Sequence, residues 1–261
     1  MTRFFPLGLA LVMIVGIGIA IAVVIAEDAG GVDFVQDIVA LDPDRPGTDV
    51  LGPMGFLIPI MALVIGASYF GADEKAGMIE HLLTWEPRRW RLLTARALGG
   101  SVSMFVIASL LSAFLVVLLV VLSAVTGGDT AGVGDVAGAI VGSVVRSGIS
   151  GALFFLIGLG FTVIANNSTA AIVGFLTWVF VIELALVSGL LPRWTQWLPV
   201  SNSLPFVSGR DFEVFPGPFD DIETFGPMAL YSSTAAGIRI LIWGIVAMAL
   251  AMVIFRKRDV D

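Results

Sequence analysis

Two ionisable residues of opposite charge, Glu183 and Arg239, stand inside long apolar runs of the sequence. An ionisable side chain at membrane depth is costly, and it usually faces other helices or a polar cavity. Counting about 1.5 Å per residue from the inner ends of their predicted helices places Glu183 about 21 Å and Arg239 about 24 Å across the membrane. These similar heights predict that the two side chains pair.

A third charge, Arg146, lies in another apolar run. The same count places it about 28 Å across, which makes it the second candidate partner for the glutamate. A buried ion pair can serve only to hold helices together. Alternatively, these intramembrane charges can line a polar path for a transported molecule, and the sequence leaves both interpretations open.

Residue patterns for catalysis or metal binding are weak in this chain. The GVGD stretch at 132–135 matches the G-x-G-D of intramembrane aspartyl proteases, but no apolar run contains the second aspartate needed to share a proton. Cysteine is absent and His81 is the only histidine, so we predict no metal site. The chain also has no G-x-x-x-x-G-K-[ST] phosphate loop. We therefore expect neither catalysis nor a cofactor in this chain.

The chain that carries these charges is strongly apolar. Hydrophobic residues make up 57% of it and charged residues 13%, whereas about a quarter of a soluble domain is charged. Apolar runs of about 20 residues span a bilayer as helices. We predict an all-α integral membrane protein with a single domain and six transmembrane helices, at 4–26, 51–70, 97–125, 145–165, 169–191 and 235–255.

Three details of this layout go beyond the count of helices. The first run could be a signal peptide, but its 23 residues exceed the usual 7–15 of a signal's apolar region, so we favour an uncleaved span. The fourth run, 136–165, is too long for one straight span. We expect its first third to lie along the outer interface before the helix turns inward. The NNS stretch at 166–168 predicts a tight polar turn.

Lysine and arginine indicate the orientation, because they accumulate on the cytoplasmic face of membrane proteins. With the N-terminus inside, nine basic residues fall inside and three outside. We therefore predict a multi-pass membrane protein with both termini in the cytoplasm and the loop at 192–230 outside. The nine are Arg3, Lys75, Arg88, Arg89, Arg91, Arg96, Arg256, Lys257 and Arg258, and the three are Arg45, Arg193 and Arg210.

Between the second and third spans, the stretch FGADEKAGMIEHLLTWEPRRWR at 70–91 becomes charged and amphipathic. On a helical wheel, Ile79 and Leu83 fall on one side, and Glu74 and Glu80 fall opposite. One interpretation is a helix that lies on the inner leaflet. However, the polar face of such helices is usually rich in Lys and Arg, whereas this one is acidic, which suits a protein partner better.

This stretch resembles the signature of the type-2 ABC transporter permease family, which follows its second span with a pattern close to E…G-t-l…L-L…P-x-R…l-l-x-x-K. The six-span layout and the ending FRKRDV are also similar to that family. The family usually has an amphipathic elbow helix before its first span, whereas only three residues precede Phe4 here, so either the elbow is missing or the true start lies upstream. The matching residues are Glu74, Gly77, Met78, Ile79, Leu82, Leu83, Pro87, Arg89, Leu92 and Leu93, with Arg96 about where the family often has Lys.

In that family the stretch is a coupling helix that docks onto a separate cytoplasmic ATPase. The resemblance therefore implies a permease subunit of an ATP-driven exporter that lies in a prokaryotic cytoplasmic membrane and works by alternating access. ATP and Mg²⁺ would be held by the partner ATPase, and a second permease copy, identical or different, would complete the transporter within the lipid bilayer; no nucleic-acid partner is expected. The implied ATPase-coupling residues are Glu74, Gly77, Ile79, Glu80, Leu82, Leu83, Pro87 and Arg89.

A second class of function shares the predicted topology. A membrane anchor or assembly subunit of another complex would also have six apolar helices, but it would transport nothing and need no ATPase. The two classes are distinguished by whether a nucleotide-binding chain accompanies this one.

Overall fold

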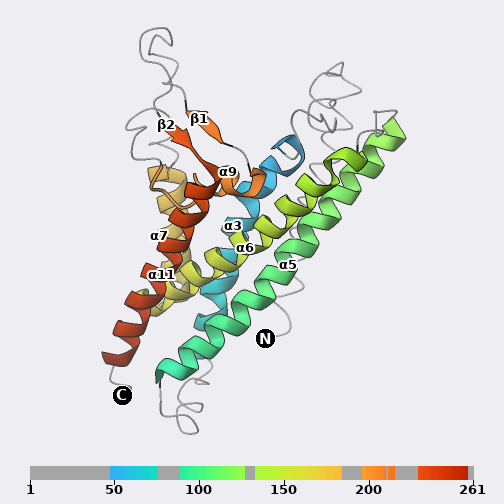
Figure 1. Cartoon of the computed structure of the whole chain (residues 1–261). Coiled ribbons are helices and arrows are strands. Elements are labelled where there is room, and N and C mark those ends of the chain that lie inside the picture. The colour runs from blue at the N-terminus through green and yellow to red at the C-terminus, as the bar shows by residue number, and fades with distance from the viewer. Residues whose placement is uncertain are drawn as a thin grey trace.

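The computed structural model describes residues 48–75, 89–126, 133–183, 196–209, 211–214 and 229–257. Long helices form a bundle over most of this length (Figure 1). A short helix, α9, and a two-stranded ribbon lie together at one end of the bundle. The helices are α3 (Thr48–Lys75), α5 (Arg89–Thr126), α6 (Val133–Ala165), α7 (Ser168–Thr177), the π-helix η1 (Trp178–Glu183), α9 (Ser203–Ser208) and α11 (Ser233–Lys257), and the strands are β1 (Phe212–Val214) and β2 (Ala229–Tyr231).

The described helices support the predicted membrane architecture. Within them, three stretches are long and apolar enough to cross a membrane: Trp90–Leu118, Ala137–Ala165 and Ser233–Lys257. Two shorter apolar helical stretches, Gly55–Gly71 and Ser168–Glu183, lie where the second and fifth spans are predicted. The predicted first span, 4–26, lies outside the described residues, so the count of six remains a prediction.

Two features differ from the expected layout. Helix α6 continues without a break through 33 residues, so the turn expected in its first third is absent. At about 1.5 Å per residue such a helix is about 50 Å long, which exceeds the ~30 Å hydrocarbon core. The expected outer loop after the fifth span contains α9 and the ribbon, in which Phe212 pairs with Tyr231 in antiparallel register. The described part of the chain is therefore helical with one small β-ribbon.

The predicted polar turn at 166–168 is confirmed. Asn166 has a positive φ of 53°, a conformation that asparagine tolerates better than most residues. The side chain of Asn167 accepts hydrogen bonds from the backbone nitrogens of Thr169 and Ala170, at 2.9 and 3.3 Å. This N-cap satisfies two donors at the start of α7, so the chain leaves α6 and enters α7 within three residues.

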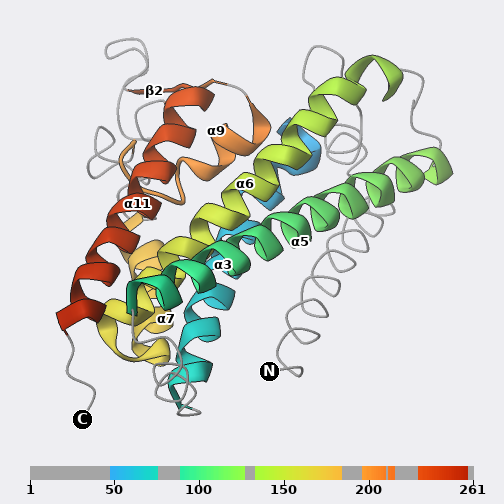
Figure 2. The same ribbon diagram turned by 60° about the horizontal axis from the view of Figure 1, so that its bottom comes forward.

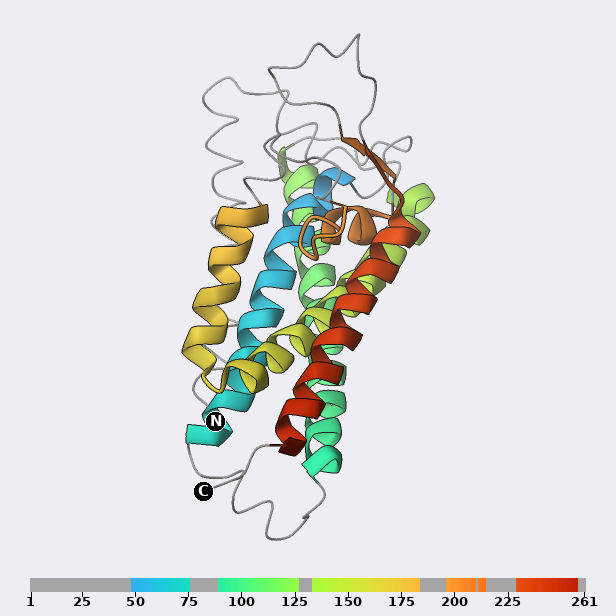
Figure 3. The same ribbon diagram turned by 90° about the vertical axis from the view of Figure 1, so that its left-hand side faces the viewer.

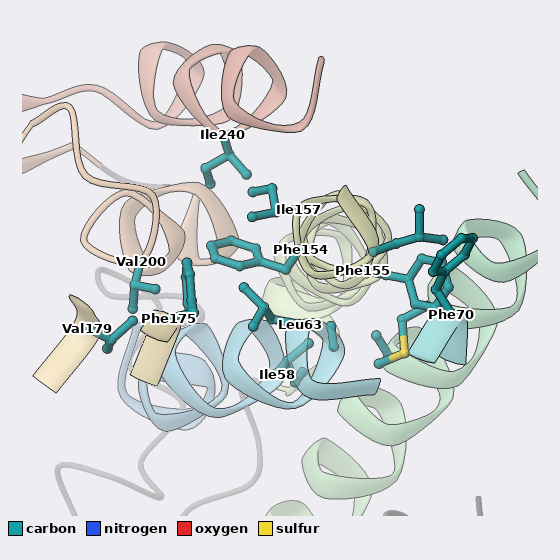
Figure 4. Close-up of a cluster of buried hydrophobic side chains, with 14 of the residues drawn as sticks. Ile58, Leu63, Phe70, Phe154, Phe155, Ile157, Phe175, Val179, Val200 and Ile240 are labelled. Atoms are coloured by element: carbon teal, nitrogen blue, oxygen red, sulfur yellow. The ribbon is translucent and has the colours of Figure 1, made fainter. Parts of the chain in front are cut away.

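Helix α6 is the centre of the bundle. In the most apolar 18-residue stretch of α6, 61% is buried, compared with 28% in the corresponding stretches of α5 and α11. Figures 2 and 3 show it crossing between α3, α5 and α11, all of which it contacts. In Figure 4, Phe154 and Ile157 of α6 lie between Leu63 of α3 and Ile240 of α11. These apolar contacts make one continuous core around α6.

Two glycines allow the backbones of α3 and α6 to touch. A Cβ atom on Gly158 of α6 would overlap the carbonyl oxygen of Leu63, and one on Gly66 of α3 would overlap that of Phe155. Small residues permit such close approach between membrane helices. Close by, the hydroxyl of Thr162 donates a hydrogen bond across the contact to the Ala67 carbonyl oxygen at 3.1 Å. The α3–α6 crossing is therefore fixed by backbone contact.

Three basic residues that are predicted to lie in the cytoplasm share one end of the bundle. The C-terminal ends of α3 and α11 and the N-terminal end of α5 lie at one end, and α9 and the ribbon lie at the other (Figure 3). The first end carries Arg91 of α5 together with Arg256 and Lys257 of α11. This arrangement agrees with the prediction that these basic residues share one side of the membrane. That this side is the cytoplasm remains a prediction.

We expect Gly158→Ala to destabilise the bundle, because the new methyl group must push the α3 backbone away. Overpacking of this kind costs about 1–3 kcal/mol. The matched control is Gly174→Ala in α7, where an added Cβ meets no atom within 4 Å. Thermal unfolding of the detergent-purified chain measures both variants. Equal effects would show that the α3–α6 contact is looser than described.

The orientation can be tested with single cysteines, since the chain has none of its own. Thr234 is exposed near the start of α11 and is therefore accessible to a reagent. We expect an impermeant thiol reagent to label Thr234→Cys in intact cells, and to label Thr84→Cys only after permeabilisation. The opposite pattern would reverse the predicted topology, and the unmodified chain is the blank.

Candidate functional site

The carboxylate of Glu183 is buried and fully hydrogen-bonded. Its side chain is 3% exposed. Oε1 accepts hydrogen bonds from Trp178 Nε1 at 3.2 Å and from the backbone nitrogen of Val200 at 3.4 Å. Oε2 accepts from the backbone nitrogen and hydroxyl of Ser201, at 3.0 and 3.1 Å. Four donors match the roughly four acceptor positions of a carboxylate, so the buried charge is satisfied without a cation.

The π-helical turn explains how Trp178 and Glu183 reach each other. The two residues begin and end η1 and are five positions apart. Five residues of an α-helix cover about 500°, which would leave the two side chains about 140° apart. A π-helix closes its hydrogen bonds from i to i+5 and so brings such residues closer to one face. The wider turn therefore lets the indole of Trp178 donate to the carboxylate.

The segment at 196–209 lies between the ends of three helices. It includes α9, which contacts α3, α6 and α11. The hydroxyl of Ser203 donates to the carbonyl oxygen of Gly55 in α3 and lies 3.4 Å from the hydroxyl of Ser150 in α6. The side chain of Asn202 donates to the Leu198 carbonyl oxygen at 2.6 Å, which closes the turn before α9. Hydrogen bonds thus anchor the 196–209 segment to the bundle.

Arg239 of α11 reaches this same segment. Its Nη1 donates to Asn202 Oδ1 and its Nη2 to Gln196 Oε1, both at 3.3 Å. Its Cζ atom lies 5.6 Å from the ring centre of Trp197, within the range of a cation–π interaction. The indole of Trp243, one turn further along α11, donates to the Trp197 carbonyl oxygen at 2.7 Å. The three residues that Arg239 contacts all belong to the 196–209 segment, and Trp243 binds the same segment.

The predicted direct pairing of Glu183 with Arg239 is wrong for the described residues. The 196–209 segment enters between the two side chains and binds both of them. Ser201 binds the carboxylate and the adjacent Asn202 binds the guanidinium. The heights along two helices could not show that a third segment separates them. The contacts of Glu183 and Arg239 support a structural role, and a place on a transport path remains a proposal.

Arg146, the second candidate partner, lies elsewhere. Its guanidinium occupies the space beside Gly209, where an added Cβ would overlap it. Gly209 ends α9 with a positive φ of 74°, which glycine adopts without strain. Arg146 therefore lies at the C-terminal end of α9, where a cation is favourable, whereas Asn202 and Arg239 lie at its N-terminal end.

The polar residues of the 196–209 segment were missed by the sequence analysis. Gln196, Ser201 and Asn202 are ordinary loop residues, and nothing in their spacing marks them as partners of charged side chains. A usable signal was the occurrence of these polar residues within five positions of Trp197, between two apolar runs that carry charges, because buried charges need hydrogen-bonding groups nearby.

The predicted ATPase-coupling residues lie at or beyond the edges of the described chain. Glu74 lies in the last turn of α3 and Arg89 begins α5; their side chains are not described. Arg96, about where the family pattern often has Lys, places its Cζ 5.9 Å from the ring centre of Tyr69 and so links α5 to α3. The remaining predicted coupling residues lie outside the described residues: Gly77, Ile79, Glu80, Leu82, Leu83 and Pro87.

Comparison with known families decides the identity of this bundle. A family model described as "ABC-2 family transporter protein" matches residues 7–260. The chain belongs to the ABC-2 transporter family. The match confirms the resemblance found at the stretch after the second span, and it extends over nearly the whole chain. No curated protein matches the chain.

We expect Trp178→Phe and Glu183→Gln to be coupled in their effects on unfolding, because the hydrogen bond joins the two side chains. The glutamine turns one acceptor into a donor that faces other donors, so it alone should cost about 1–3 kcal/mol. The double variant should differ from the sum of the single variants by about 0.5–3 kcal/mol. Chemical denaturation in detergent measures this difference.

The control cycle combines Glu183→Gln with Trp90→Phe. Trp90 is exposed at the start of α5, at the other end of the bundle. These two effects should add to within about 0.5 kcal/mol. If both cycles are equally additive, the Trp178–Glu183 hydrogen bond does not contribute to stability.

Proposed function

We propose that this ABC-2 family protein is the membrane-spanning permease subunit of an ATP-driven exporter and works with a separate ATPase subunit. The observation that carries the proposal is the family match over residues 7–260 in a sequence that has no phosphate-binding loop of its own. ATP and Mg²⁺ would bind to the partner, and this chain would contribute no catalytic group. A second permease copy would complete the transporter.

The packing at one end of the bundle supports a mechanical link to such a partner. Helix α3 ends at Lys75 and α5 begins at Arg89, so the proposed coupling segment between them is joined to both helices. Arg96 packs on Tyr69, and α3 touches α6 through Gly66 and Gly158. A displacement of the coupling segment would therefore pass to α3 and α5 and from them to the central helix. Alternating access would use this route.

The test is co-purification of a nucleotide-binding chain with this protein at matched expression. We expect Glu74→Lys combined with Glu80→Lys to lose the partner, because charge complementarity sets the register of a docked helix. Membrane insertion should be unaffected, since neither residue lies in a predicted span. The matched control is Asp259→Lys with Asp261→Lys, which makes the same change of charge near the predicted cytoplasmic C-terminus.

The alternative of a leaflet-bound helix predicts a different result. Two new lysines would strengthen attraction to anionic lipid by about 1 kcal/mol each and leave any partner in place. If no nucleotide-binding chain co-purifies with the unmodified protein, the exporter proposal fails, and a membrane anchor or assembly subunit becomes the better assignment.

A further inference from the structure

Arg239 carries a charge that the described residues do not neutralise. Its two hydrogen bonds go to the neutral amide oxygens of Asn202 and Gln196, both at 3.3 Å. A guanidinium has five N–H donors, so these bonds use two of them. The two carboxylates described nearby are otherwise engaged, since Glu183 binds the 196–209 segment and Asp211 accepts from the backbone nitrogen of Ser233.

The position of Arg239 along α11 places its side chain within reach of lipid headgroups. It lies six residues after Ser233, where the 25-residue helix begins. A helix of this length extends about 37 Å and passes a ~30 Å hydrocarbon core by a few ångströms at each end. The Cα of Arg239 then lies about 5 Å inside the core boundary, and a long arginine side chain can extend from that depth to the headgroups.

The surroundings of the guanidinium fit a lipid better than a soluble ion. Trp197 lies beneath it and is 54% exposed, as expected of tryptophans at the membrane interface. On α11 itself, Ile242 and Val246 are exposed apolar residues, three and seven positions further into the membrane on the same side of the helix. They offer a surface for an acyl chain directly below the arginine.

We propose that Arg239 and Trp197 form a binding site for the phosphate group of a phospholipid. The lipid belongs to the leaflet at the N-terminal end of α11, which is the outer leaflet in the predicted orientation. The planar guanidinium would donate two parallel hydrogen bonds to phosphate oxygens, while its contacts with Gln196 and Asn202 hold it in place. The site requires membrane embedding but no ATPase. The lipid-binding proposal can therefore be tested independently of the exporter proposal.

The decisive variant is Gln196→Glu in the full-length chain. It keeps the shape of the side chain that accepts from Arg239, but it supplies a carboxylate that neutralises the guanidinium internally. The fold should therefore survive, whereas Arg239→Gln removes the contacts that hold the 196–209 segment. We expect Gln196→Glu to weaken binding of phosphatidylglycerol about five- to ten-fold, measured by native mass spectrometry of the delipidated protein in neutral detergent.

Two controls separate this site from general effects of charge and of acyl chains. Thr234→Glu adds the same charge near the same end of α11, but five residues before Arg239 and so on a different side of the helix. It should bind phosphatidylglycerol like the unmodified chain. Diacylglycerol has the same acyl chains without the phosphate. It should bind weakly, and with the same affinity to the unmodified chain and to the Gln196→Glu variant.

The source of the phosphate is tested by adding inorganic phosphate alone. The lipid proposal expects no increase in thermal stability from inorganic phosphate at concentrations where phosphatidylglycerol binds. If inorganic phosphate stabilises the unmodified chain but not Gln196→Glu, while phosphatidylglycerol does not bind, the site is one for a soluble anion and the proposal is overturned. It is equally overturned if Gln196→Glu binds phosphatidylglycerol as tightly as the unmodified chain.

Discussion

The crossing of α3 and α6 is the contact on which the described bundle depends. Gly66 and Gly158 place each backbone against a carbonyl oxygen of the other helix, so the distance between these helices cannot shrink and cannot grow without opening a gap. Helix α6 then packs against α5 on one side and α11 on another. In lipid, apolar burial gives little net attraction between helices, so close packing of this kind supplies much of the cohesion.

The 196–209 segment solves a second problem, which is how two charges can be held within apolar helices without touching. Glu183 receives backbone and side-chain donors, and Arg239 receives amide oxygens and an aromatic face. Each charge is thus solvated by dipoles of one short segment. A direct ion pair would have joined two helices only, whereas this arrangement joins η1, α9 and α11. It also leaves N–H groups of the guanidinium that can donate to another partner.

The sequence was sufficient for features that depend on neighbouring residues. The length of apolar runs predicted α5, the later part of α6, and α11, and the NNS stretch predicted the turn before α7. Contacts between distant residues were not predictable in the same way, since the height of Glu183 and Arg239 says nothing about rotation around each helix or about a loop that returns between them. Family resemblance indicated the coupling residues from Gly77 to Pro87, which lie outside the described residues.

The π-helix at Trp178–Glu183 makes this helix sensitive to its exact number of residues. A π turn holds one residue more than the α turn that could replace it, and single π turns are frequent at functional sites. If the same residues formed an α turn without the loss of one of them, everything beyond the turn would rotate by about 100°. The direction in which Glu183 points therefore depends on the one additional residue that the π turn holds as much as on the identity of any side chain.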